Sequence, residues 1–207
     1  MTNTKVVTVM NLKGGSGKTT TTALLAHAYL KQGKKVCIID ADPQQSIMRW
    51  ADAAGWTIPV LGKPVKKLDL LWKGMIGDRF DYLLIDTPPL DEKAGIVFGA
   101  LRAASYVLTP MAPTLSEMDR LPDVWDAIDQ VNDSRADSIN SSILFNRTIP
   151  NAGSTEQYRK DIEEEGYRVL TTTIPRREAI AQSFNQEIVR LYGHDQVAIE
   201  LEKEVKA

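Results

Sequence analysis

The chain has 207 residues, of which 43% are hydrophobic and 25% charged, and its formal net charge is −2 at pH 7. This length is sufficient for one domain with a substantial core, and the charge excludes a protein that attracts nucleic acid through an overall basic field. The single cysteine, Cys37, excludes an internal disulfide and favours a reducing, cytoplasmic setting. No apolar stretch is long enough to cross a bilayer, and the amino terminus lacks a signal-peptide pattern. Because the sequence has no repeat, low-complexity segment or obvious interdomain linker, we expect one domain over residues 1–207.

Short apolar runs rich in β-branched residues alternate with longer amphipathic stretches along the chain. The runs predict strands over residues 5–10, 35–40, 82–86, 105–109, 142–146 and 169–174. Helices are expected over residues 19–32, 94–104, 116–131, 155–165 and 195–206. Pro122 should kink the third of these helices or delay its start. Continuous apolar strands separated by helices imply an α/β fold, a doubly wound and mostly parallel sheet with helices on both faces.

The first predicted strand runs into NLKGGSGKTT, a glycine-rich turn followed by a helix. Gly14, Gly15 and Gly17 let backbone amides turn toward an anion, and the following helix offers its positive end. Lys18 would reach the terminal phosphates of a nucleotide, and Thr19 would place its hydroxyl on a magnesium ion. The alternative is a plain turn with a solvated Lys18, but the order of strand, loop and helix favours a phosphate loop.

Two residues depart from the usual phosphate-loop pattern. Leu12 stands where that pattern has a glycine, five positions before Gly17, and Lys13 adds a second lysine at the mouth of the loop. With these residues, KGGSGKTT resembles the deviant Walker A motif, and the chain is similar to the ParA/MinD family of positioning ATPases, which are P-loop NTPases. The resemblance implies ATP and Mg²⁺ as cofactors and a phosphate-binding loop made of Gly14, Gly15, Ser16, Gly17, Lys18, Thr19 and Thr20.

The same resemblance assigns a role to Lys13. In the family, the lysine ahead of the glycines crosses a dimer interface and touches the phosphates of the partner's nucleotide. A triphosphate held between two subunits concentrates negative charge that a cation from each side can neutralise, so ATP would favour a homodimer. The alternative is a surface lysine before a turn.

Acidic residues end two of the predicted strands. Asp40 and Asp42 close the second strand in IIDADPQQS, and Asp86 closes YLLID. By resemblance, Asp42 orients the attacking water, Asp40 supports the magnesium ion and its water shell, and Asp86 is a Walker B carboxylate that accepts a magnesium-bound water. The alternative for the first pair is a turn that only ends the strand.

Two later segments, FNRT and TIPRRE, follow the ends of predicted strands and can therefore line the same site. Similar segments in the family frame the adenine base, which points to Asn146, Pro175 and Arg176. Ordinary loop chemistry is the competing explanation for these residues.

Other sequence features distinguish this chain from several relatives of the ParA/MinD family. The chain ends in DQVAIELEKEVKA, which is dominated by charge and argues against binding to a membrane. One cysteine cannot hold the shared cluster of a nitrogenase iron protein, and there is no tyrosine-rich tail like that of bacterial tyrosine kinases. Because the first strand starts at residue 5, we expect a short ParA-type protein without an amino-terminal DNA-reading domain.

A ParA-type protein would dimerise with ATP, bind DNA non-specifically on the nucleoid, and be activated by a ParB-like or cargo-adaptor protein. Residues 63–79 contain five Lys or Arg against two Asp, whereas the last part of the chain is net acidic, so the sequence supports DNA binding only in part. The alternatives are a metabolic ATP-dependent ligase of the dethiobiotin-synthetase kind and a protein scaffold that ATP switches between partners.

Overall fold

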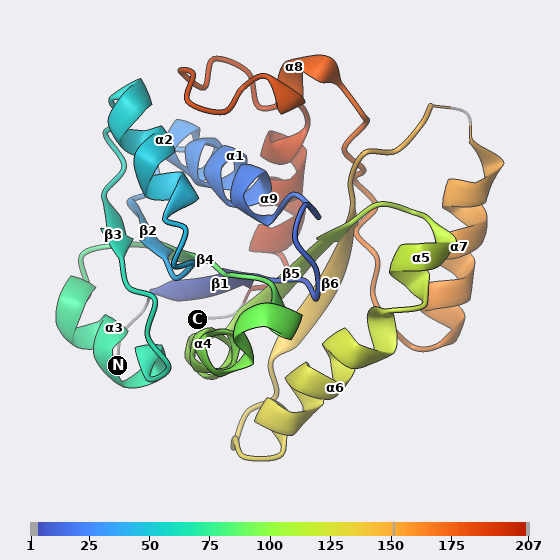
Figure 1. The fold of residues 1–207 in the computed structure, drawn as a ribbon, viewed down its shortest axis with the longest axis horizontal. Coiled ribbons are helices and arrows are strands. Elements are labelled where there is room, and N and C mark those ends of the chain that lie inside the picture. The colour runs from blue at the N-terminus through green and yellow to red at the C-terminus, as the bar shows by residue number, and fades with distance from the viewer. Residues whose placement is uncertain (1–3, 151, 206–207) are drawn as a thin grey trace.

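The computed structural model describes residues 4–150 and 152–205. Within them, six strands form one parallel sheet in the order β3-β2-β4-β1-β5-β6 (Figure 1). The strands are β1 (Lys5–Val9), β2 (Val36–Asp40), β3 (Val60–Gly62), β4 (Tyr82–Asp86), β5 (Tyr106–Met111) and β6 (Asn140–Phe145). The helices are α1 (Lys18–Lys31), α2 (Ser46–Ala54), α3 (Leu68–Ile76), α4 (Leu90–Ala103), α5 (Leu115–Met118), α6 (Leu121–Asn132), α7 (Gly153–Glu164), α8 (Glu178–Ala181) and α9 (His194–Glu202). In this part of the chain no helix is long and apolar enough to span a membrane.

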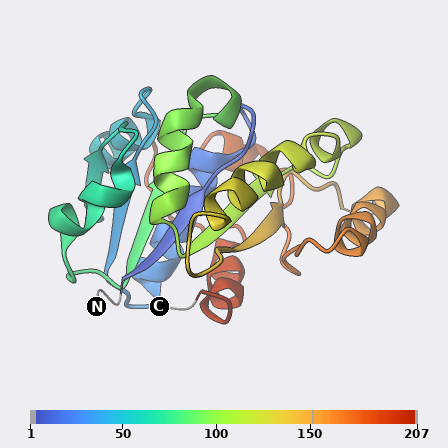
Figure 2. The same ribbon diagram turned by 90° about the horizontal axis from the view of Figure 1, so that it is seen from below.

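Helices cover both faces of the sheet, which confirms the doubly wound fold that the alternating pattern predicted. Helices α1, α2 and α9 lie on one face, and α3, α4 and α6 lie on the other (Figures 1 and 2). In β4, Leu84 packs with the first group of helices, whereas Leu83 and Ile85 pack with the second. All of β4 is therefore buried, and its sequence is a continuous apolar run rather than an alternating one.

The parallel direction of the strands brings their carboxyl ends to one edge of the sheet. At this edge Val9 of β1 is in register with Asp86 of β4, and Asp86 is in register with Asp40 of β2. The loop before α1 and the segments after β5 and β6 start at the same edge. The fold therefore gathers the predicted site residues from segments that are far apart in sequence.

All predicted strands except the last are confirmed, with small shifts at their ends. The predicted helix over residues 116–131 is two helices, α5 and α6, because Pro122 lies in the first turn of α6, where its missing N–H costs nothing. The helix predicted over residues 94–104 begins earlier, at Leu90. The last predicted helix is α9, and residue 206, where it was expected to end, lies outside the described residues. The sequence patterns did not predict β3, α2, α3 or α8.

The strand predicted over residues 169–174 is wrong. The segment lies beside β6, but among the described residues it makes a single isolated bridge, between Ile143 and Val169. Farther along, the backbone N–H groups of Thr171 and Thr172 donate to the carboxylate of Glu200, at 2.7 and 3.0 Å. This side chain takes the place of a strand partner, so the β-branched run stays irregular.

Candidate functional site

The loop between β1 and α1 leaves backbone amides open to an anion. Gly15 and Gly17 have φ of +73° and +93°, in the left-handed region that only glycine adopts without steric cost. Helix α1 begins at Lys18, and no side chain of residues 4–150 or 152–205 caps its first turn. The unpaired N–H groups and the positive end of the helix point to an anion site where the sequence predicted the phosphates.

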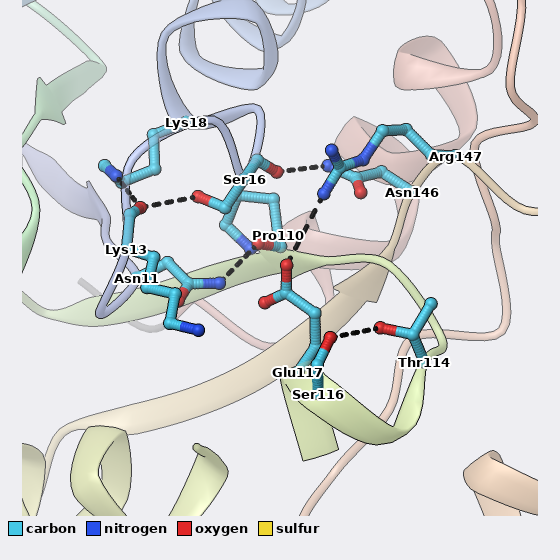
Figure 3. Close-up of polar contacts among 10 residues, drawn as sticks. All are labelled: Asn11, Lys13, Ser16, Lys18, Pro110, Thr114, Ser116, Glu117, Asn146 and Arg147. Atoms are coloured by element: carbon cyan, nitrogen blue, oxygen red, sulfur yellow. Dashed lines mark hydrogen bonds and ion pairs between the residues drawn. The ribbon is translucent and has the colours of Figure 1, made fainter. Parts of the chain in front are cut away.

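The side chains of Lys13 and Lys18 point in different directions. The Lys18 ammonium donates a hydrogen bond of 2.8 Å to the carbonyl of Lys13, and the Ser16 hydroxyl donates to the same carbonyl at 3.4 Å. Lys18 is only 6% exposed, and burial lowers its pKa although the charge of Asp86 acts in the opposite direction. The Lys13 side chain extends away from Lys18 (Figure 3), and among the described residues it forms no ion pair.

Leu12, which replaces the usual glycine, has a packing role that the sequence did not reveal. Its side chain is 6% exposed and belongs to the apolar cluster that contains Met10 and Leu90. The carbonyls of Asn11 and Leu12 accept hydrogen bonds from the N–H groups of Leu90 and Asp91, both at 3.2 Å. The start of the loop is therefore fastened to the start of α4, and a glycine at position 12 would remove the apolar part of this attachment.

Asp86 and Thr19 form the centre of the predicted metal site. The Thr19 hydroxyl donates to Asp86 Oδ2 at 2.8 Å, and the Thr22 hydroxyl lies 3.4 Å from Oδ1. Burial raises the pKa of Asp86 to about 7, with the Thr19 hydrogen bond opposing the shift and the charge of Asp40 adding to it. A hydroxyl and a carboxylate are hard oxygen donors of the kind that Mg²⁺ takes beside the phosphates of a nucleotide, so the residues fit this ion.

Asp40 holds the segment that carries Asp42. Asp40 Oδ1 accepts from the N–H of Asp42, and Oδ2 accepts from the N–H of Met48 in α2, both at 3.1 Å. Asp40 is buried, and this burial raises its pKa. Asp42 itself is half-buried and accepts from the N–H of Gln44 at 2.8 Å. The structure thus brings Asp40 beside Asp86 and fixes the turn from which Asp42 would act.

A cavity of about 950 Å³ opens beside the loop. Its lining includes Gly15, Gly17 and Thr20 from the loop side and all three residues predicted to frame the base, Asn146, Pro175 and Arg176. The size and lining are those of a small-molecule pocket that continues from the anion site. Lys13, Asp40, Asp42 and Asp86 are not among the residues that line this cavity.

Asn146 joins the cavity to the loop. Its side-chain N–H donates to the carbonyl of Ser16 at 2.7 Å, whereas its Oδ1 is buried and has no hydrogen-bond partner among the described residues (Figure 3). Two neighbours that the sequence did not single out also line the cavity, Arg147 and Glu117, which form an ion pair at 3.5 Å. Arg147 follows directly after Asn146 in FNRT, but nothing local in the sequence pointed to Glu117.

Comparisons with known proteins agree with this geometry. A family model described as the CobQ/CobB/MinD/ParA nucleotide binding domain matches residues 7–189. The maintenance of carboxysome distribution protein A of Halothiobacillus neapolitanus is 30% identical over 182 residues, which cover 82% of this chain and 78% of that protein.

Two solved structures with the same fold contain nucleotide analogues. A plasmid partition protein of Borrelia burgdorferi bound to AMPPNP has a TM-score of 0.76 and 19% identity, covering 98% of this chain and 99% of that one. Cobyrinic acid a,c-diamide synthase of Mycobacterium smegmatis with an ATP analogue and magnesium has a TM-score of 0.78 and 20% identity, covering 97% and 95%. The prediction of ATP and Mg²⁺ agrees with these structures.

Proposed function

Because the chain belongs to the CobQ/CobB/MinD/ParA family of nucleotide-binding domains, we propose that it is an ATPase that dimerises when it binds ATP. In this proposal the ATP-bound dimer binds DNA without sequence preference and positions a plasmid, a chromosome or another cargo. A ParB-like or cargo-adaptor protein stimulates hydrolysis, which releases the dimer. The protein acts in the cytoplasm, on the nucleoid. The name of the Halothiobacillus relative, which refers to carboxysome distribution, supports a positioning role.

The main support for the proposal is that the side chains of Lys13 and Lys18 point in different directions. Lys18 is buried and bonded within its own loop, so it serves the nucleotide of its own subunit. Lys13 extends out of the loop and pairs with no carboxylate of the described chain (Figure 3). An unpaired cation at the mouth of a phosphate site suits the triphosphate of a second subunit, where it would gain charge-assisted hydrogen bonds.

Each remaining residue has a role in this scheme. The amides of residues 14–20 hold the phosphates, and Thr19 and Asp86 hold the metal ion with support from Asp40. When bound, Mg²⁺ would supply positive charge that neutralises the terminal phosphates. Asn146, Pro175 and Arg176 bind the adenine side of the nucleotide in the cavity beside the loop.

Asp42 is the residue that acts on the attacking water. Its turn is fastened by Asp40 and Gln44, which leaves one carboxylate oxygen, Oδ2, without a hydrogen bond in the described chain. We assign this oxygen to accept a hydrogen bond from the water and hold it in line with the terminal phosphate. Turnover should be slow, since a fast enzyme would lose its ATP before it reached a cargo.

The proposed DNA contact has a candidate surface around α3. The basic residues of this part of the chain are all exposed, namely Lys63, Lys66, Lys67, Lys73 and Arg79. One of the two acidic residues between them, Asp69, is paired with Arg102 at 3.4 Å and is therefore partly neutralised. Of these residues Lys73 lies in α3 and the others lie in the segments before and after it, and basic residues gathered in this way can contact the phosphates of a duplex.

A metabolic ligase is the second candidate, since the fold also occurs in cobyrinic acid a,c-diamide synthase. The molar mass in solution and the release of phosphate, measured with ATP, with ADP and without nucleotide, separate the two candidates. We expect a dimer with ATP alone and slow phosphate release in the absence of any small acceptor. A chain that stays monomeric with saturating ATP would contradict the proposal.

A further inference from the structure

The segment between α8 and α9 places an aromatic ring on the cavity beside the phosphate loop. Phe184 lines this cavity and is 40% exposed. Ile149, which is 63% exposed, and the half-buried Ile180 belong to the same lining. These three side chains give the cavity an open apolar side, which a flat apolar part of a ligand would bury.

Phe184 also packs on α2. The centroid of its ring lies 5.3 Å from that of Trp50, with the two ring planes tilted by 53°, and Trp50 is fully buried. The indole N–H of Trp50 donates to the carbonyl of Gln186 at 2.8 Å. In Figure 1 the segment after α8 accordingly runs beside α2. One ring contact and one hydrogen bond therefore fasten the segment that carries Phe184 to a helix far away in sequence.

Helix α2 is fastened at its start to the turn that carries Asp42. The N–H of Met48 donates to Asp40 Oδ2 at 3.1 Å, and the guanidinium of Arg49 donates to the carbonyl of Gln44. The N–H of Gln44 in turn donates to Asp42. A displacement of α2 would therefore displace the carboxylate to which the attacking water is assigned.

We propose that Phe184 is a positioning residue for hydrolysis: it packs against the nucleobase and, through Trp50 and α2, fixes the turn that carries Asp42. This inference rests on the proposed function, since it requires a nucleotide whose base enters the cavity. Bases stack well on aromatic side chains. A base on the Phe184 ring would restrict the motion of that ring, and with it the motion of Trp50 and α2. The phosphates alone would occupy the loop without this contact, so the base itself should promote hydrolysis.

The competing explanation is a structural role, in which Phe184 only shields Trp50 from water. Phe184→Ala removes the ring, and Phe184→Tyr keeps it. Val189→Ala is the matched control, because Val189 lies in the same segment, is 77% exposed and is not among the residues that line the cavity. Thermal unfolding of each variant establishes that it is folded at the assay temperature.

The test compares ATP with inorganic triphosphate, which has no base. Calorimetry measures the affinity of each protein for both ligands, and phosphate release is measured at saturating concentrations of each. Tryptophan emission reports on the ring contact. Because the chain has four tryptophans, Trp50→Phe identifies the part of the emission that comes from this residue.

We expect Phe184→Ala to weaken ATP binding by roughly fivefold or more and to leave the affinity for inorganic triphosphate unchanged. Phosphate release at saturating ATP should also fall, by roughly tenfold, because an interaction that acts beyond ground-state binding is lost. ATP should change the emission of Trp50 in the wild type and in the Val189 control but not in Phe184→Ala. Phe184→Tyr should restore affinity, turnover and the emission change.

Two outcomes would overturn the inference while the proposed function stands. One is a Phe184→Ala variant that hydrolyses saturating ATP at the wild-type rate, which would leave Phe184 with a part in binding or folding only. The other is an equal loss of affinity for ATP and for inorganic triphosphate, because the ring would then act on the loop and not on the base. A wild-type chain that binds no ATP would contradict both the inference and the proposed function.

Discussion

The side-chain nitrogen of Asn146 lies 2.6 Å from the position that a Cβ on Gly17 would occupy. From there it donates a hydrogen bond of 2.7 Å to the carbonyl of Ser16. Gly17 is therefore required twice, once by its φ of +93° and once by the close approach of the amide. The end of β6 and the phosphate loop are held together by this contact, although 130 residues separate the two bonded residues in the chain.

Substitutions at these two positions should not be additive. We expect Asn146→Ala to lower the free energy of unfolding by about 1–2 kcal/mol through the lost buried hydrogen bond. Gly17→Ala should cost about 2–4 kcal/mol, because backbone strain and the clash with Asn146 combine. The double variant should cost at least about 1 kcal/mol less than the sum, since the clash is removed. Urea unfolding of the four proteins measures this; additivity within about 0.5 kcal/mol would show that the two side chains are not in contact.

Lys13 and Lys18 should separate dimerisation from binding. Lys13→Ala should leave the ATP affinity of the monomer within about threefold of wild type, while ATP-dependent dimerisation weakens by about thirtyfold or more, as expected for a cation lost from a desolvated contact. Lys18→Ala should abolish ATP binding. Lys31→Ala is the control, because Lys31 lies at the far end of α1, the helix that begins at Lys18. Its ATP binding and its dimerisation should equal those of the wild type. Analytical ultracentrifugation with ATP gives the dimerisation constant, and normal dimers of the Lys13 variant would refute its assignment.

Asp42 should affect turnover and leave affinity unchanged. Asp42→Ala removes the proposed contact to water, so we expect phosphate release to fall by about 100-fold or more, the usual scale for the loss of a side chain that acts on the attacking water. ATP affinity and ATP-dependent dimerisation should persist, because the residue is outside the cavity and the loop. Asp52→Ala on the exposed side of α2 is the matched control. Wild-type hydrolysis by the Asp42 variant, with or without an activator, would remove this residue from the mechanism.

His194 should make the fold sensitive to acid. It is buried at the start of α9, it bonds to the carbonyl of Leu191 at 2.8 Å, and burial lowers its pKa from 6.5 to about 4. Between these values the unfolded chain binds more protons than the folded chain, so stability falls as the pH drops from 6.5 to about 4. The loss should reach at most about 3 kcal/mol.

His194→Gln, which cannot titrate, isolates this effect. The difference in unfolding free energy between wild type and variant should change across that window and level off below it. His27→Gln is the comparison, since burial also lowers the pKa of His27 but the side chain is less enclosed. Parallel stability curves for wild type and His194→Gln would contradict the account.

The central strands could be predicted because each is a buried apolar run that ends at a polar residue or at a glycine-rich turn. Burial on both faces explains why β2 and β4 were found almost to the residue, with Asp40 and Asp86 at their ends. The missed β3 has only three residues, too few to show a pattern. In α3, Leu68, Trp72 and Ile76 recur every four residues and are buried, so this helix had a readable signal between the lysines around it.

In the candidate site, too, some features could be predicted from local sequence and others could not. Loop glycines, Lys18, Thr19 and the strand-end aspartates are local motifs, and in the structure Thr19 contacts Asp86 while Asp40 lies in register with Asp86. The packing of Leu12 on Leu90 and the ion pair of Glu117 with Arg147 depend on segments that meet only in the folded chain. The wrong strand after residue 168 has a similar cause, because the carboxylate that caps it comes from α9.

Binding to random-sequence duplex DNA, measured with ATP, with ADP and without nucleotide at low and moderate salt, tests the central claim most directly. The account predicts binding with ATP alone, which weakens as salt rises because lysines displace counterions from the phosphates. Lys13→Ala should lose this binding together with the dimer. Absence of binding in every state, or binding that is equal with ATP and ADP, would contradict a positioning ATPase that travels on DNA.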